Sequence, residues 1–98
     1  KINTITIIMN NKSWGAEKAY QRDYYNKRYI GTNIKSPPFH KVAKLYGANG
    51  YNITKLSQFE GILRKSLKSK KPVIINIEVN PKSIYSFRKD SFKHKLKV

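Results

Sequence analysis

The hydrophobic residues of this chain follow two kinds of pattern. Apolar runs rich in β-branched residues at 4–9 and 73–79 are typical of buried strands, and the second run is nearly continuous. Between them, apolar residues recur at spacings of three and four, which predicts helices over 39–46 and 57–68. A short strand is predicted at 51–53. This order of strands and helices predicts one parallel sheet with covering helices, an α/β fold.

The predicted helices have recognisable ends and apolar faces. A helix over 16–29 is expected to follow the first strand, and a loop over 31–38 to follow that helix. Pro37-Pro38 would open the next helix, because proline suits the first helical position. Ser57 and Glu60 have the spacing of a capping box and would begin the last helix. The side chains expected to face the core are Phe39, Val42, Ala43 and Tyr46 in one helix and Phe59, Ile62, Leu63 and Leu67 in the other.

Two asparagines, Asn10 and Asn11, stand at the end of the first predicted strand. Ligand sites in open α/β sheets lie beyond the carboxyl ends of strands. The Asn side-chain oxygen is a neutral ligand of the kind that Mg²⁺ accepts when a phosphorylated ligand and a carboxylate supply the negative charge. The alternative is that the pair merely ends the strand in a turn. The dipeptide by itself leaves both interpretations open.

The residues around this pair resemble a known family. The run Asn10-Asn11-Lys12-Ser13-Trp14-Gly15-Ala16-Glu17-Lys18 resembles the C-terminal, diphosphate-binding part of thiamine diphosphate-dependent enzymes. Further matching segments are Gln21, 23–25, 28–33, 39–50 and the basic tail 87–93. Within that superfamily the chain looks most like the sulfoacetaldehyde acetyltransferases, which would convert sulfoacetaldehyde and phosphate to acetyl phosphate and sulfite. Acetolactate synthase-like carboligases are the alternative.

The resemblance implies thiamine diphosphate and Mg²⁺ as cofactors and gives roles to the residues of the first run. The Asn11 side-chain oxygen and the Ser13 backbone carbonyl would bind Mg²⁺, which anchors the diphosphate. Trp14 and Gly15 would lie beside that diphosphate. Lys18 would pair with an anionic sulfonate or phosphate, or else be an exposed surface lysine. The residues that would face the substrate are Ala16, Glu17, Lys18 and Tyr20, with Glu17 as the candidate catalytic residue. The family usually has Lys-Asn where this chain has Ala19-Tyr20.

The resemblance also predicts that parts of the site lie elsewhere. The family's metal motif opens with Gly-Asp-Gly, whose Asp binds Mg²⁺, and no Asp occurs at 1–9. The glutamate that activates the cofactor lies in a separate domain. We therefore expect a C-terminal fragment of a longer polypeptide, inactive by itself, with 1–81 in the diphosphate-side domain and 82–98 as a basic tail. The parent would be a homodimer or tetramer, because the family builds its site between subunits. The sheet edge at 5–9 would be uncovered.

Charge supports a competing hypothesis from another functional class. Lys and Arg number 21 against 5 Asp and Glu, which gives a net charge of +16 of the kind that nucleic-acid binders show. Lysine outnumbers arginine, however, and arginine is the residue suited to bidentate contact with guanine. The basic clusters at 65–71 and 88–97 are expected to be solvated surface, with polyanion binding as the alternative. A free-standing basic module remains the competing hypothesis.

Two further compositional features limit the chemistry. The chain has no Cys, which excludes disulfides and thiol chemistry. No apolar stretch approaches the roughly 20 residues of a membrane span. We expect the parent to be cytoplasmic.

Overall fold

The computed structural model describes residues 2–85 of the chain. These residues divide into two units, which are considered separately. The sheet unit contains the chain up to Asn10 together with Ser36–Val79. The turn unit contains Asn11–Lys35 and the chain from Asn80 onward. The basic segments at 87–93 and 88–97 lie outside the described residues, as does most of the tail expected at 82–98.

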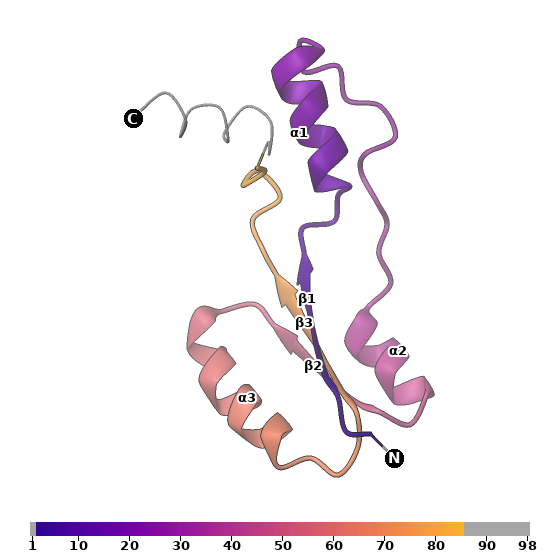
Figure 1. Cartoon of the computed structure of the whole chain (residues 1–98), viewed down its shortest axis with the longest axis vertical. Coiled ribbons are helices and arrows are strands. Elements are labelled where there is room, and N and C mark those ends of the chain that lie inside the picture. The colour runs from indigo at the N-terminus through magenta and orange to yellow at the C-terminus, as the bar shows by residue number, and fades with distance from the viewer. Residues whose placement is uncertain (1, 86–98) are drawn as a thin grey trace. The chain divides into compact units, whose positions relative to one another are not determined.

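The sheet unit is built on three parallel strands, β1 (Ile5–Asn10), β2 (Asn49–Ile53) and β3 (Val73–Glu78), in the order β1-β3-β2. Parallel strands require crossover connections, and helices provide them. α2 (Phe39–Leu45) precedes β2, and α3 (Phe59–Leu67) connects β2 to β3. Figure 1 shows these two helices on opposite sides of the sheet. The prediction of an α/β fold with one parallel sheet and covering helices is confirmed.

The core of this unit lies between the sheet and α3. Ile53, Val73 and Ile75 are at most 1% exposed, and Phe59 and Ile62 of α3 pack against them. Full burial of such a side chain contributes about 1.5–3 kcal/mol. The alternation of side chains along a strand puts Val73 and Ile75 on one face, so the apolar run of β3 supplies this core directly.

α2 crosses the other face of the sheet at close range. Ala43 is 1% exposed, and Gly50 in β2 lies directly beneath the backbone of His40. An ideally placed Cβ at Gly50 would stand 1.8 Å from the His40 carbonyl oxygen. Only glycine therefore permits this approach of helix to strand.

Two helices begin or end at other residues than predicted. α1 (Gly15–Tyr24) stops before the predicted end at 29, because Asn26 and Lys27 adopt positive φ angles of 51° and 58° that leave the right-handed helix. α2 begins after Pro38, which is its N-cap rather than its first helical residue.

The start of α3 differs from the predicted capping box at Ser57 and Glu60. A 3₁₀ turn, η1 (Leu56–Gln58), precedes the helix. The Gln58 side-chain oxygen accepts hydrogen bonds from the backbone N–H groups of Thr54 and Lys55, at 3.0 and 3.1 Å. Gln58 therefore anchors this turn.

Two of the apolar side chains expected in the core are exposed. Tyr46 is 87% exposed because it lies just beyond the end of α2, at its C-cap. Leu67 is 70% exposed in the last turn of α3. In both helices the predicted core residues nearer the N-terminus are partly or fully buried, whereas the last predicted core residue is exposed.

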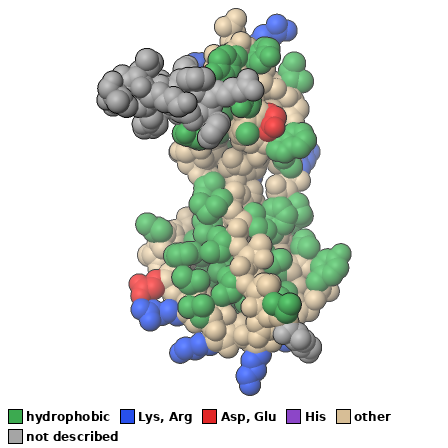
Figure 2. Space-filling view, viewed as in Figure 1, with side chains coloured by type: hydrophobic (Ala, Val, Ile, Leu, Met, Phe, Trp, Pro, Cys, Tyr) green, Lys and Arg blue, Asp and Glu red, His purple; other side chains and the backbone are tan. Residues whose placement is uncertain are grey.

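The β1 edge of the sheet is uncovered, as predicted. Within the described residues β1 pairs only with β3, and Ile7 and Met9 are 42% and 64% exposed. An apolar groove of about 430 Å³ lies between this strand and the start of α3. Its lining includes Ile7, Met9, Leu56, Phe59, Ile77 and Val79. Figure 2 shows hydrophobic side chains gathered over this part of the molecule, with Lys and Arg at its lower margin.

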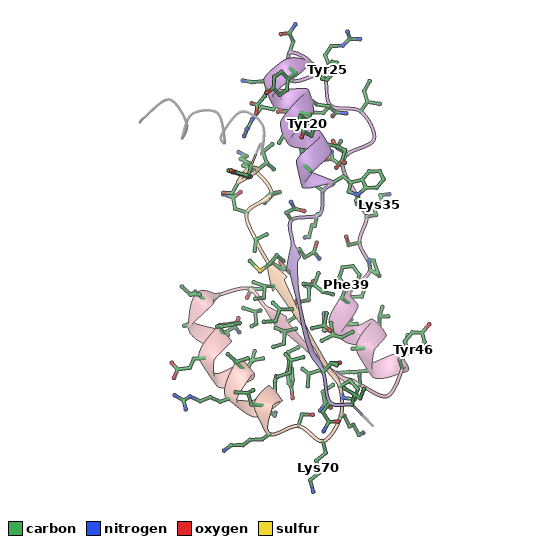
Figure 3. The ribbon with its side chains drawn as sticks, viewed as in Figure 1. Tyr20, Tyr25, Lys35, Phe39, Tyr46 and Lys70 are labelled. Atoms are coloured by element: carbon green, nitrogen blue, oxygen red, sulfur yellow. The ribbon has the colours of Figure 1, made fainter. Side chains whose placement is uncertain are left out.

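The basic cluster at 65–71 is a solvated surface in the structure. Lys65, Lys68, Lys70 and Lys71 are all exposed, and Figure 3 shows Lys70 pointing away from the fold. The Lys65 ammonium lies 5.5 Å from the centre of the Tyr51 ring. Among residues 2–85, no helix is both long and apolar enough to cross a membrane.

The close approach at Gly50 leads to a stability prediction. Gly50→Ala should destabilise the chain by about 3 kcal/mol or more, because the added methyl group forces α2 away from β2. Gly61→Ala is the matched control, since a Cβ there meets nothing within 4 Å. That control should stabilise α3 by about 0.5–1 kcal/mol. Thermal unfolding measures both, and an unchanged melting temperature for Gly50→Ala would contradict the packing described.

Candidate functional site

The turn after β1 begins with Asn11. Its side-chain oxygen accepts a hydrogen bond from the Ser13 backbone N–H at 3.1 Å, and Lys12 between them has a φ of 55°. This is the local turn that Asn favours. An amide oxygen has two lone pairs, and the turn uses one of them. The two interpretations of Asn11 are therefore compatible, because the residue that shapes the turn keeps an oxygen lone pair for a cation.

The turn is braced by a short antiparallel bridge between Ser13 and Asn33. The Trp14 N–H donates to the Thr32 carbonyl at 2.8 Å, and the Ile34 N–H donates to the Lys12 carbonyl at 2.9 Å. These bonds flank Ser13, so its own carbonyl is not the acceptor of either. The Ser13 carbonyl is thus a second oxygen that the bridge leaves available to a cation.

Gly15 begins α1 and lies against Asn11. An ideally placed Cβ at Gly15 would stand 2.8 Å from the Asn11 side-chain nitrogen, so the glycine makes room for this side chain. The first N–H groups of a helix have no partners within the helix and favour phosphate. The turn therefore presents two uncharged oxygen ligands beside a helix N-terminus.

This donor set fits Mg²⁺ held together with a diphosphate. Amide and carbonyl oxygens are ligands of the hard kind that Mg²⁺ prefers, and phosphate oxygens usually complete its coordination. No group of three or more His, Cys, Asp or Glu residues able to hold a metal occurs in the described part of the chain. A cation at this turn would therefore need negative charge from a bound phosphorylated ligand or from protein outside the described residues.

The other residues assigned by sequence follow along the turn and α1. Trp14 is 61% exposed, and Ala16 and Glu17 are exposed as well. Tyr20 lies four residues after Ala16, on the same side of the helix, and its ring is 6.1 Å from that of Tyr24. Figure 3 shows Tyr20 midway along α1. The structure thus brings Asn11, Ser13 and Gly15 together and places the expected substrate residues in sequence beyond them.

Sequence reasoning gave no role to the residues that hold the returning loop against α1. The Gln21 amide nitrogen donates to the Ile30 carbonyl, and its oxygen accepts from the Ile30 N–H, both at 3.0 Å. Thr32, whose carbonyl accepts from the Trp14 N–H, is 3% exposed. A single Gln side chain that bonds to the backbone of a later loop produces no repeating sequence pattern. Its role can therefore be seen only in the structure.

Sequence reasoning also missed a chain of amide side chains in the sheet unit. Asn10 donates to Asn76 at 3.1 Å, Asn76 donates to Asn52 at 2.6 Å, and Asn52 donates to Glu78 at 3.1 Å. Asn76 is 3% exposed, so its polar atoms require these partners. The feature of the sequence that could have indicated these bonds is Asn76, a polar residue within the otherwise apolar run of β3.

Comparison with known proteins gives a family match over most of the chain. The family model described as "Thiamine pyrophosphate enzyme, C-terminal TPP binding domain" matches residues 1–77, which include the turn, β1, β2 and all but the last residue of β3. The chain belongs to this family. Thiamine pyrophosphate is another name for thiamine diphosphate, so the family resemblance and the expected cofactor class are both supported.

Individual relatives of this thiamine pyrophosphate domain are much longer proteins. Sulfoacetaldehyde acetyltransferase of Alcaligenes xylosoxydans xylosoxydans is 28% identical over 101 residues, which cover 99% of this chain and 17% of that protein. Acetolactate synthase of Arthrospira platensis is 32% identical over 80 residues, 80% of this chain and 14% of the relative. The mitochondrial acetolactate synthase catalytic subunit of Saccharomyces cerevisiae is 30% identical over 76 residues, which cover 78% of this chain and 11% of that protein. The chain thus spans at most 17% of these relatives.

The contact between Gly15 and Asn11 leads to a binding prediction. In a full-length enzyme carrying this sequence, Gly15→Ala should weaken thiamine diphosphate binding by about tenfold, because its methyl group displaces the Asn11 side chain. Gly61→Ala adds a methyl group in open space and should leave the affinity unchanged. Equilibrium titration with the cofactor measures both variants. Equal affinities for Gly15→Ala and the unmodified enzyme would mean that the cofactor site does not depend on this turn.

Proposed function

We propose that this sequence is the C-terminal part of a thiamine diphosphate- and Mg²⁺-dependent acetyltransferase. The enzyme would convert sulfoacetaldehyde and phosphate to acetyl phosphate and sulfite. The observation that carries this proposal is the extent of similarity to the Alcaligenes acetyltransferase, which reaches 99% of the chain against 80% for the Arthrospira acetolactate synthase. The second candidate is an acetolactate synthase-like carboligase, which the higher identity of 32% favours.

In this proposal the Asn11–Ser13 turn holds the cofactor through its metal. The Asn11 side-chain oxygen and the Ser13 carbonyl bind Mg²⁺, and the N-terminus of α1 at Gly15 and the neighbouring Trp14 lie beside the diphosphate. When bound, the thiazolium ring of thiamine diphosphate supplies the nucleophilic carbon for the aldehyde. The chain's own contribution is to fix the position of that cofactor.

The residues proposed to face the substrate come next along α1. Glu17 is exposed in the first turn of the helix. In this proposal its carboxylate would exchange a proton with the reacting oxygen. Ala16 leaves space, and Tyr20 lies on the same side of α1, one turn later. We propose Glu17 as the catalytic residue of this group and the other two as lining residues.

The proposal also requires protein from outside this chain. We propose that the remaining domains of the same polypeptide supply the acidic metal ligand and the pocket for the rest of the cofactor. A further strand would add to the free edge of β1, since an exposed apolar edge is a pairing site. We further propose that the parent is at least a homodimer, with the complete site formed between subunits.

The metal role of Asn11 can be tested in the full-length protein. Asn11→Ala should weaken Mg²⁺-dependent binding of thiamine diphosphate by about tenfold or more, because a bound oxygen is removed and the alanine cannot replace it. Asn3→Ala is the matched control, as its exposed amide donates to the Ser69 carbonyl at 3.3 Å in the sheet unit, outside the turn. Titrating cofactor at several Mg²⁺ concentrations separates the metal effect from the cofactor effect. If the affinity stays the same in Asn11→Ala, Asn11 is not a metal ligand.

The reaction itself can be tested with two substrates. The full-length protein should release sulfite and form acetyl phosphate from sulfoacetaldehyde, phosphate, thiamine diphosphate and Mg²⁺. The isolated 98-residue chain should form neither product, because the acidic metal ligand and the aminopyrimidine pocket are expected in other domains. Formation of acetolactate from pyruvate without sulfite release would instead establish the carboligase.

A further inference from the structure

The Lys18 side chain is held in place by two contacts within the turn unit. Its ammonium donates a hydrogen bond to the Asn33 side-chain oxygen at 2.9 Å. The same nitrogen lies 5.3 Å from the centre of the Tyr29 ring, within the range of a cation–π contact. The side chain is also partly buried. These contacts fix a long side chain that would otherwise lose considerable conformational freedom on binding a ligand.

Neither contact neutralises the positive charge of Lys18. Asn33 offers a neutral amide oxygen, and Tyr29 offers the face of a ring. The ion pairs found among the described residues join Arg22 to Asp23 and Arg64 to Glu60, and neither involves Lys18. An ammonium has three N–H donors, and Asn33 accepts from one of them. The group therefore retains its charge and donors for an anion.

Asn33 also fixes where this charge lies. Its backbone forms the bridge with Ser13, whose carbonyl is one of the two oxygens offered by the turn. Lys18 belongs to α1, which begins at Gly15 in the same turn. A single residue thus joins the ammonium to the proposed cofactor turn, and all of these residues lie in the turn unit. A substrate bound near the turn would meet a fixed cation there.

We propose that Lys18 is a specificity-determining residue that binds a tetrahedral oxyanion of the substrates. The inference rests on the proposed function, which supplies two such groups, the sulfonate of the aldehyde and inorganic phosphate. A compact ammonium is a point charge that suits either of them. Asn33 and Tyr29 are positioning residues, because they act by holding Lys18 rather than by touching the anion.

The test measures anion binding directly, so that it does not depend on turnover. Isethionate carries the sulfonate of sulfoacetaldehyde but no carbonyl group, and it cannot react. Calorimetry of the full-length protein, loaded with thiamine diphosphate and Mg²⁺, would give Kd values for isethionate and for phosphate. The variants are Lys18→Met, which removes the charge, Lys18→Arg, which keeps it, and Asn33→Ala, which releases the side chain. Lys68→Met, on the exposed end of the sheet unit, is the matched control.

The expected result is at least a tenfold weaker binding of one anion in Lys18→Met. Lys18→Arg should restore most of that affinity, Asn33→Ala should weaken it by a smaller factor, and Lys68→Met should not change it. Loss of isethionate binding would identify the sulfonate as the ligand, and loss of phosphate binding would identify the phosphate.

Three results would overturn the proposal. The first is that the wild-type protein binds neither anion. The second is that the Lys18→Met variant binds both anions with unchanged affinity. The third is that Lys18→Met lowers only the affinity for thiamine diphosphate. Failure of the proposed function is separate from these results. It would appear as a wild-type protein that forms no acetyl phosphate while its anion binding still depends on Lys18.

Discussion

The parallel pairing of β1 with β3 is the constraint on which the rest of the structure depends. It joins residues near the start of the chain to residues that come after β2 and α3 in the sequence. The Val73 N–H donates to the Thr4 carbonyl at 2.8 Å at one end, and the Val79 N–H donates to the Asn10 carbonyl at 3.1 Å at the other. The Asn10 side chain adds its bond to Asn76. Because closing so long a loop costs entropy, the buried apolar residues of β3 must supply most of the compensating free energy.

The atoms proposed to bind the metal also shape the turn that follows β1. Asn11 shapes the backbone with one lone pair of its side-chain oxygen and keeps the other, and the bridge to Asn33 leaves the Ser13 carbonyl unused. Gly15 leaves room for the Asn11 amide. A site made of such neutral oxygens needs an anionic ligand to hold a cation, which agrees with a family defined by a diphosphate cofactor.

The sequence was sufficient to predict features that repeat along the chain. The apolar runs at 4–9 and 73–79 identified β1 and the central strand β3, and the nearly continuous run of β3 reflects its position inside the sheet. Features set by single residues were not predictable. The positive φ angle of Asn26 ends α1 early, and Gln58 rather than Ser57 anchors the start of α3. The bond between Asn10 and Asn76 depends on strand pairing, which no local pattern specifies.

The central claim is that the Asn11–Ser13 turn is the metal-binding part of a thiamine diphosphate site. The most direct measurement is a crystal structure of the full-length protein with thiamine diphosphate and Mg²⁺. We expect Mg²⁺ at about 2.0–2.1 Å from both the Asn11 side-chain oxygen and the Ser13 carbonyl oxygen, with diphosphate oxygens among its other ligands. A cofactor-bound Mg²⁺ that contacts neither oxygen would contradict it.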